Sequence, residues 1–197
     1  MDAIYFVHIP RTGGTSLLRF FRTVPGLFVY DPIRAICDKH ASFNSQTLKQ
    51  LRERYRHVWA VTILRDPFAH TLSLNAYIRW DRSHPGHLLA CDKCLMEWCK
   101  LVGTVTPRDA FPYYPRFFGT TLAEAAEALV KLDAVFRTEI LSHDVLAFCR
   151  RIGLSVGPFP HLNSRAHRVA SAPERHLISK LRADDFELWR QHGGYRS

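Results

Sequence analysis

Residues 4–17 read IYFVHIPRTGGTSL, and this stretch constrains the fold of the chain more than any other. An apolar run of strand type ends at Pro10, two glycines follow, and Thr15 opens an amphipathic segment. The pattern predicts a strand, a tight loop and a helix. Gly13 and Gly14 would let the backbone turn with positive φ and leave its N–H groups open to an anion, at which the start of the helix also points. We therefore expect a phosphate-binding loop.

Side chains of the same stretch would add donors around the anion. The hydroxyls of Thr12, Thr15 and Ser16 and the guanidinium of Arg11 are the candidates. The spacing is not that of a Walker loop, because GxxxxGK[ST] is absent and the basic residue precedes the glycines. Two glycines after a strand also fit an ordinary tight turn, so this feature alone does not identify an activity.

The longer string HIPRTGGTSL resembles the 5′-phosphosulfate loop of the carbohydrate sulfotransferases, which include the heparan sulfate 2-O- and 6-O-sulfotransferases and usually read HIPKTGGTS. The resemblance implies binding of 3′-phosphoadenosine 5′-phosphosulfate (PAPS) as sulfuryl donor. The loop residues that it assigns to the donor are Arg11, Thr12, Gly13, Gly14, Thr15 and Ser16. Arg11 stands where the family has Lys; its guanidinium would stabilise charge on the leaving phosphate but could not give up a proton.

Residues 58–64, VWAVTIL, are all apolar or β-branched and predict a buried strand in the middle of a parallel sheet. Pro67 suits the first turn of a helix, so Arg65 would lie at the carboxyl edge of the sheet, where open α/β folds bind ligands. The segment RDPFAHTLSLNAY resembles the 3′-phosphate motif of the same enzymes, RDPxxRxxSxY. The resemblance implies that Arg65 and Ser73 bind the 3′-phosphate, which distinguishes PAPS from ATP-like nucleotides.

Two positions depart from this second motif. His70 stands where the family often has Arg, and Asn75 stands where it often has Tyr, the nearest tyrosine being Tyr77. The resemblance therefore assigns no cofactor contact to His70 or Asn75.

The candidate general base is His40. It follows an expected strand at residues 27–30, in a segment, CDKHASF, that resembles the HADW-type catalytic histidine segment of the 6-O-sulfotransferases. A side chain that titrates near neutrality is suited to take the proton of an acceptor hydroxyl, although a solvated loop histidine fits the same position. Further along, HLNSR resembles the HxN segment before the cofactor-covering loop, and Arg165 or Arg168 would close over the nucleotide.

Strands alternate with helices along the whole chain. A last strand is expected at residues 133–137, and helices are expected at 15–23, 45–57, 121–132 and 141–152. A final helix is expected to start at Pro173, to run through residues 173–189 and to end near Gly193. This order predicts one α/β domain over residues 1–197, with a doubly wound, mostly parallel sheet and a P-loop-like phosphosulfate-binding loop. A chain of 197 residues with 47% hydrophobic composition can bury a substantial core.

The chain carries 27 Lys and Arg against 18 Asp and Glu, a net charge of +9. This charge favours an anionic cofactor or a polyanion, but no Lys/Arg block interleaved with aromatics is present, so we expect no nucleic-acid partner. The N-terminus has no basic region before its apolar run and no stretch of 18 apolar residues, so we expect no signal peptide, no membrane span and a cytoplasmic location.

Five cysteines, an odd number, without a secretory signal favour reduced thiols. Cys91, Cys94 and Cys99 cluster, and the spacing of the first two is one that zinc sites use. The apolar stripe of one buried helix, which includes Cys91 and Cys99, explains the same residues, and we expect no zinc. We expect no metal requirement either, because arginines and N–H donors meet the charge of PAPS.

Together these features predict a sulfotransferase that moves a sulfuryl group from PAPS to an acceptor hydroxyl by in-line displacement and releases adenosine 3′,5′-bisphosphate (PAP). The family likeness suggests a carbohydrate or glycoside acceptor. A non-catalytic PAP- or polyanion-binding module of the same fold is the main alternative. A P-loop kinase fits less well, because the Walker Lys and an obvious Mg²⁺-holding pair are absent.

Overall fold

The structure is a computed structural model, and it describes residues 1–30, 43–160 and 168–192, except for the side chain of Arg108. Its centre is a sheet of four parallel strands in the order β2-β1-β3-β4. The strands are β1 (Asp2–Val7), β2 (Leu27–Tyr30), β3 (Val58–Leu64) and β4 (Ala134–Arg137). β1 pairs with β3 in the register Tyr5 to Ala60, and β3 pairs with β4 in the register Thr62 to Val135.

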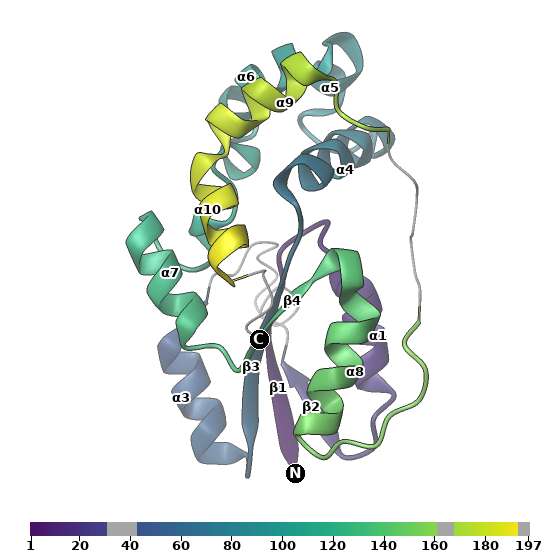
Figure 1. The fold of residues 1–197 in the computed structure, drawn as a ribbon, viewed down its shortest axis with the longest axis vertical. Helices are drawn as coiled ribbons and strands as arrows, with labels where there is room; N and C mark the ends of the chain where they lie inside the picture. The colour runs from purple at the N-terminus through teal and green to yellow at the C-terminus, as the bar shows by residue number, and fades with distance from the viewer. Residues whose placement is uncertain (31–42, 161–167, 193–197) are drawn as a thin grey trace.

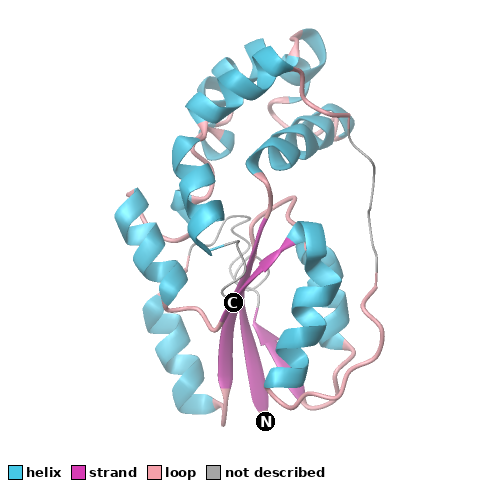
Figure 2. Cartoon of the chain, viewed as in Figure 1, coloured by secondary structure: helices cyan, strands magenta, loops and turns pink. Residues whose placement is uncertain are grey.

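Helices cover both faces of this sheet (Figures 1 and 2). One face packs against α1 (Gly14–Arg22) and α8 (Leu141–Arg151), whose buried side chains join those of Phe6 and Ile63. The other face packs against α3 (Ser45–Arg54) and α7 (Leu122–Val130). The two central strands are therefore buried on both sides, which explains why β1 and β3 are almost entirely apolar. The expected doubly wound parallel α/β fold is confirmed.

A second group of helices lies beyond the carboxyl ends of the strands, in the upper half of Figure 1. This group comprises α4 (Pro67–Trp80), α5 (His87–Asp92), α6 (Leu95–Val105), α9 (Ala172–Leu181) and α10 (Ala183–His192). Short 3₁₀ turns occupy Pro107–Asp109, Pro115–Phe117 and Thr138–Ile140. Trp98 of α6, Ile178 of α9 and Leu188 of α10 are buried in the core that this group shares with the sheet.

The structure differs from the sequence-based expectation in this helical group. The expected single helix over residues 173–189 is two helices that meet at Arg182, although no Gly or Pro stands there. The one helix that was expected to carry both Cys91 and Cys99 is likewise split into α5 and α6, with Cys94 as the N-cap of α6. At the first break Arg182 is buried and bonded to Asp185, and at the second Cys94 is exposed. The apolar periodicity of the sequence did not indicate either break.

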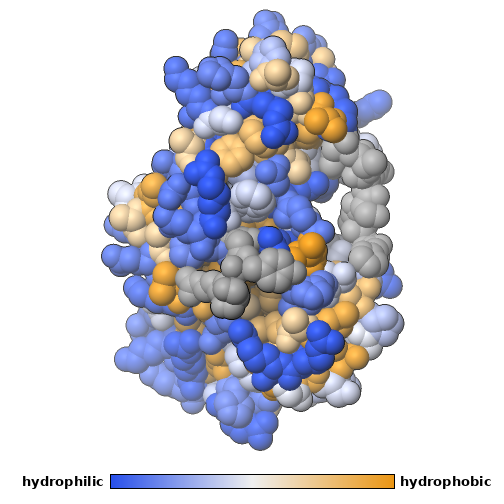
Figure 3. All heavy atoms as spheres, viewed as in Figure 1, coloured by the Kyte–Doolittle hydropathy of each residue, from blue (hydrophilic) through white to orange (hydrophobic). Residues whose placement is uncertain are grey.

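Hydrophilic residues predominate on the face drawn in Figure 3, where the described hydrophobic residues form separate spots. None of the helices in the described ranges combines the length and the apolar composition that a bilayer crossing requires.

Candidate active site

The predicted phosphate-binding loop joins β1 to α1. Two of its residues have positive φ, Arg11 at 67° and Gly13 at 96°. Gly13 is the N-cap of α1, and its carbonyl accepts the N–H groups of Ser16 and Leu17. The N–H groups of Gly14 and Thr15, which precede these two, have no earlier helical carbonyl to bond, so they and the positive end of the helix dipole face the loop. The strand, loop and helix expected from the sequence are present, with the geometry that anion binding needs.

The loop side chains are not equally placed for an anion. Thr12 is fully buried, and its hydroxyl donates to the carbonyl of Ile9 at 2.8 Å. Because that proton is used within the loop, the backbone N–H of Thr12 is its remaining candidate donor. Thr15 is exposed, whereas Ser16 is buried and 5% accessible.

Arg65 follows β3 directly and reaches the loop. Its Nη1 donates to the carbonyl of Arg11 at 3.0 Å, across 54 residues of sequence. Burial lowers the pKa of Arg65, while Glu139, Tyr114 and Asp66 act in the opposite direction. A guanidinium remains charged under these conditions, so Arg65 brings a positive charge to the loop.

Helix α4 completes the contact between the two sequence motifs. The helix begins as expected, with Pro67 in its first turn and the side chain of Asp66 accepting the N–H of Ala69 at 2.9 Å. One turn further on, Ser73 is 1% exposed, and its hydroxyl oxygen lies 3.4 Å from Nε of Arg11. The Arg11 guanidinium also lies over the ring of Tyr77, 5.0 Å from its centroid. The 5′- and 3′-phosphate motifs therefore meet at Arg11.

The sequence reasoning missed two residues of this site. Tyr77 lies four residues after Ser73, hence on the same face of α4, and that spacing was a usable signal. Thr138 follows β4, and its hydroxyl donates to the carbonyl of Thr12 at 2.6 Å. A polar residue directly after a parallel strand was the available signal for Thr138, because the carboxyl ends of such strands share one edge of the sheet.

His70 and Asn75, the two departures from the second motif, are both buried on α4. Nε2 of His70 lies 3.0 Å from the carbonyl of Pro10, and Nδ1 lies 3.0 Å from Nη1 of Arg182. Burial, and then the neighbouring Arg182, lower the pKa of His70 well below its usual range. With both nitrogens engaged inside the protein, His70 is not placed to take a proton from an acceptor.

The candidate base His40 and the candidate covering residue Arg165 lie outside the described residues. Arg168, the other residue considered for covering the nucleotide, forms an ion pair with Glu174, at 2.6 Å between Nη2 and Oε1. This pairing lowers the pKa of Glu174 to about 2. Arg168 thus stabilises the start of α9 in this structure.

The cysteine cluster does not form one apolar stripe. Cys91 and Cys94 are exposed, whereas Cys99 is buried in the core, which raises the pKa of its thiol to about 12. The interpretation of Cys91 as a core residue was therefore wrong, while that of Cys99 is confirmed. Within residues 1–30, 43–160 and 168–192, no three His, Cys, Asp or Glu side chains converge as metal ligands.

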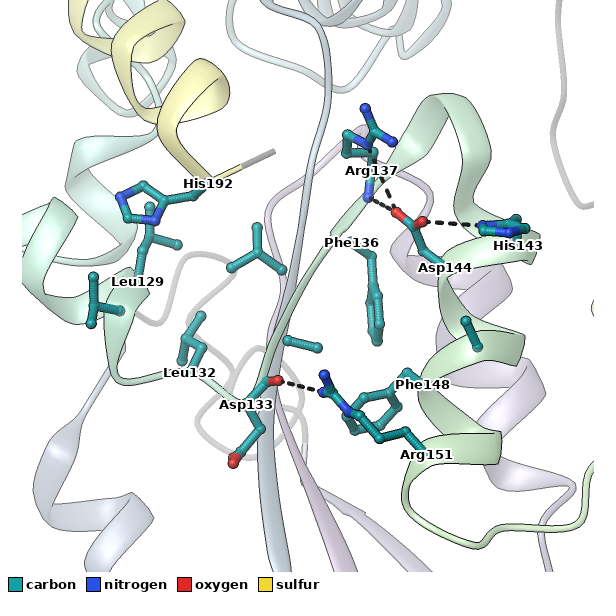
Figure 4. Close-up of a pocket in the computed structure, with 14 residues that line it drawn as sticks. Leu129, Leu132, Asp133, Phe136, Arg137, His143, Asp144, Phe148, Arg151 and His192 are labelled. Carbon is teal, nitrogen blue, oxygen red and sulfur yellow. Dashed lines mark hydrogen bonds and ion pairs between the residues drawn. The ribbon is translucent and has the colours of Figure 1, made fainter. Parts of the chain in front are cut away.

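A cavity of about 410 Å³ runs along the edge strand β4, between α7, α8 and the end of α10 (Figure 4). Two of its charged side chains bond to backbone groups of the lining: Asp144 accepts the backbone N–H of Arg137 at 3.0 Å, and Arg151 donates to the backbone carbonyl of Asp133 at 2.9 Å. Asp144 also lies 3.9 Å from Nε of Arg137. The loop residues at Arg11 and Arg65 do not line it. The cavity is therefore separate from the candidate anion site.

Comparison with solved structures relates the fold of the chain to that of a known protein. The chain matches the crystal structure of a sulfotransferase from Alicyclobacillus acidocaldarius with a TM-score of 0.58, over 97% of this chain and 95% of that one. The two proteins share a fold. Their sequence identity is 11%, so the likeness is one of architecture and does not extend to the heparan sulfate enzymes that the motifs resemble. No protein-family model and no curated protein sequence matches the chain.

Proposed function

We propose that this protein is a sulfotransferase that transfers a sulfuryl group from PAPS to an acceptor hydroxyl. The observation that carries the proposal is the 3.0 Å contact between Arg65 and the backbone of Arg11. It joins two motifs, separated in the sequence, in one cationic site at the carboxyl edge of a parallel sheet, where this class of fold binds its ligands. The architecture shared with a bacterial sulfotransferase supports the same function.

The donor set fits a 5′-phosphosulfate. PAPS, when bound, supplies an activated sulfuryl group whose bond to the 5′-phosphate breaks as the acceptor oxygen bonds to sulfur. The first-turn N–H groups of α1 and the guanidinium of Arg11 would face the negative charge that grows on the leaving phosphate. Donors held in place by a folded loop need no reorganisation at that moment, which is the main source of electrostatic catalysis.

Discrimination between nucleotides would depend on Arg65 and Ser73. A guanidinium and a hydroxyl at one edge of the site suit a phosphate monoester, and charge-assisted hydrogen bonds to Arg are the stronger kind. The expected ligand is therefore a nucleotide with a 3′-phosphate, PAPS before transfer and PAP after it.

His40 would take the proton of the acceptor hydroxyl as its oxygen attacks sulfur. We propose a carbohydrate or glycoside as acceptor, on the strength of the motif resemblance. Arg165 would close over the nucleotide from the segment after Pro160.

Calorimetric titration with PAP and AMP, followed by an acceptor screen with labelled PAPS, tests the proposal. Tight PAP binding, weak AMP binding and label transfer to a hydroxyl acceptor are the expected results. PAP binding without transfer to any acceptor would favour the binding module, and magnesium-dependent use of ATP would favour a kinase. Equal affinities for PAP and AMP would contradict the assignment of the 3′-phosphate site.

A further inference from the structure

Arg182 is a fully buried arginine at the break between α9 and α10. Its Nε donates to Asp185 at 2.5 Å. Its Nη1 lies 2.8 Å from the carbonyl of Pro67, 2.9 Å from the hydroxyl of Thr71 and 3.0 Å from Nδ1 of His70. A charge buried this deeply is costly unless it is paired and hydrogen-bonded, and Arg182 is both.

The contact with Arg182 determines which nitrogen of His70 carries a proton. Arginine has donors only, so Nδ1 of His70 must accept, and the proton of the neutral ring lies on Nε2. That N–H donates to the carbonyl of Pro10 at 3.0 Å, one residue before Arg11 in the phosphate loop. The ring is held in this orientation by Tyr113 and Tyr114, at centroid distances of 4.8 and 5.3 Å.

The same buried network reaches the second motif. Asp185, the partner of Arg182, accepts the backbone N–H groups of Tyr113 and Tyr114, at 2.9 and 2.6 Å. The hydroxyl of Tyr114 in turn donates to the carbonyl of Arg65 at 2.6 Å. One ion pair on the C-terminal helices is thus connected to the backbone on both sides of the proposed site.

We propose that Arg182 is a positioning residue for the phosphate loop: it holds His70 in the tautomer whose Nε2–H binds the Pro10 carbonyl. His70 then serves as a structural donor in the place where the motif often has an arginine. The ligand part of this inference depends on the proposed function, whereas the tether between Arg182, His70 and Pro10 does not.

Two substitutions of His70 separate the tether from simple packing. A Gln side chain places its amide nitrogen near the position of Nε2, so His70→Gln can keep the donor to Pro10. An Asn side chain reaches only the Nδ1 position, so His70→Asn keeps a partner for Arg182 and loses the donor. We expect His70→Asn to weaken PAP binding about 10-fold, the usual scale for one lost hydrogen bond, and His70→Gln to stay within about 3-fold of the parent protein. His143, an exposed histidine on α8, provides matched control substitutions.

Hydrogen exchange at the amides of residues 13–16 is measured on the same variants without any ligand. Faster exchange in His70→Asn than in His70→Gln is expected, and similar exchange in the two would overturn the tether. If the parent protein binds no PAP, the proposed function fails, but this exchange contrast still decides whether His70 holds the loop.

The proposed role of Arg182, which is to fix the tautomer of His70, is tested by ¹⁵N NMR of the His70 ring. The parent protein should show a single neutral tautomer with the proton on Nε2. Arg182→Met combined with Asp185→Asn removes both charges of the ion pair and keeps an acceptor for the tyrosine N–H groups, which protects folding. A mixture of tautomers in this double variant is expected, and a persisting single Nε2–H form would overturn the role of Arg182. If the double variant does not fold, Arg182→Lys gives the same readout, because one ammonium cannot reproduce all of the guanidinium contacts.

Discussion

The imidazole of His8 occupies the space that a side chain on Gly14 would need. A Cβ atom on Gly14 would lie 2.2 Å from Nε2 of His8, closer than any real contact allows. The His8 ring also stacks on Phe6 at a centroid distance of 5.1 Å, so it lies between the strand and the first residue of α1. Gly14 is therefore required by its packing against His8, as well as by the approach of an anion to the backbone N–H groups of the loop.

Gly14→Ala should destabilise the protein by about 1–3 kcal/mol, the usual cost of overpacking, and should weaken PAP binding because the loop must shift. Urea unfolding and calorimetry measure the two effects. Adding His8→Ala should restore part of the stability, since it makes room for the methyl group. Gly157→Ala, where a Cβ would meet nothing within 4 Å, is the matched control. An additive double variant would show that the two residues are not coupled.

Arg65→Ala should abolish most of the preference for PAP over AMP. Loss of a charge-assisted hydrogen bond costs about 1.5–3 kcal/mol, or about 10- to 100-fold in PAP affinity, while AMP affinity should change much less. Arg65→Lys keeps the positive charge but loses the two-pronged guanidinium. Its preference for PAP over AMP should therefore lie between those of the parent protein and Arg65→Ala. Arg52→Ala, on the half-exposed surface of α3, controls for net charge. An equal loss for PAP and AMP would reassign Arg65 to holding the loop backbone alone.

His40→Ala should lower kcat by about 10²-fold or more while leaving PAP affinity unchanged, because a general base acts on the acceptor and not on the nucleotide. The turnover rate with an acceptor found in the labelled-PAPS screen gives kcat, and calorimetric titration with PAP gives the affinity. His143→Ala is the surface control. Near-normal turnover in His40→Ala would move the role to another histidine such as His161, but not to His70, whose two nitrogens are engaged.

The reduced protein should carry no stoichiometric zinc. Cys91 and Cys94 are exposed, whereas Cys99 is buried in the hydrophobic core, so the three thiols do not share one environment. Metal analysis of protein prepared without chelator measures the zinc content. One zinc per chain that disappears in Cys94→Ser would contradict this prediction.

His70 should make stability fall as the pH is lowered. Its pKa in the folded protein is well below the ordinary value of 6.5, because of burial and then of Arg182, with Arg65 and Arg11 acting in the same direction. The unfolded chain therefore binds a proton near pH 6.5 that the folded protein excludes, so this stabilisation is complete above that pH and is lost below it. The free energy of unfolding should drop by roughly 1.4 kcal/mol per pH unit from this group alone.

Urea unfolding at pH 7.5 and pH 5 compares the parent protein with His70→Gln, which cannot titrate in this range. The other charged or titratable groups around the ring remain in both proteins, so the difference between their pH dependences reports the titration of His70. These groups are Arg182, Asp185, Tyr113, Tyr114, Arg65 and Arg11. Identical pH dependence in the two proteins would show that folding does not lower the pKa of His70.

Much of the fold could be predicted because local pattern and burial agree. Strand β3 has the expected bounds, since seven apolar or β-branched residues in a row suit only a strand covered on both faces. Helix α7 begins after Thr121, where a helix was expected, because Thr121 and Glu124 form a capping box. Helix α4 likewise begins at Pro67.

The sequence alone determined the succession of the strands and of the helices that cover the sheet, the glycine-containing loop after β1 and the place of Arg65 at the sheet edge, because these depend on periodicity, glycine and proline over a few residues. Only the tertiary structure decided that Arg65 reaches the backbone of Arg11, that His70 is buried between the Pro10 carbonyl and Arg182, and that the last helix breaks at Arg182. At this break Arg182 bonds to Pro67 and His70, which are more than 100 residues away in the sequence. Hydrogen bonds of such long range produce no periodic pattern from which they could be predicted.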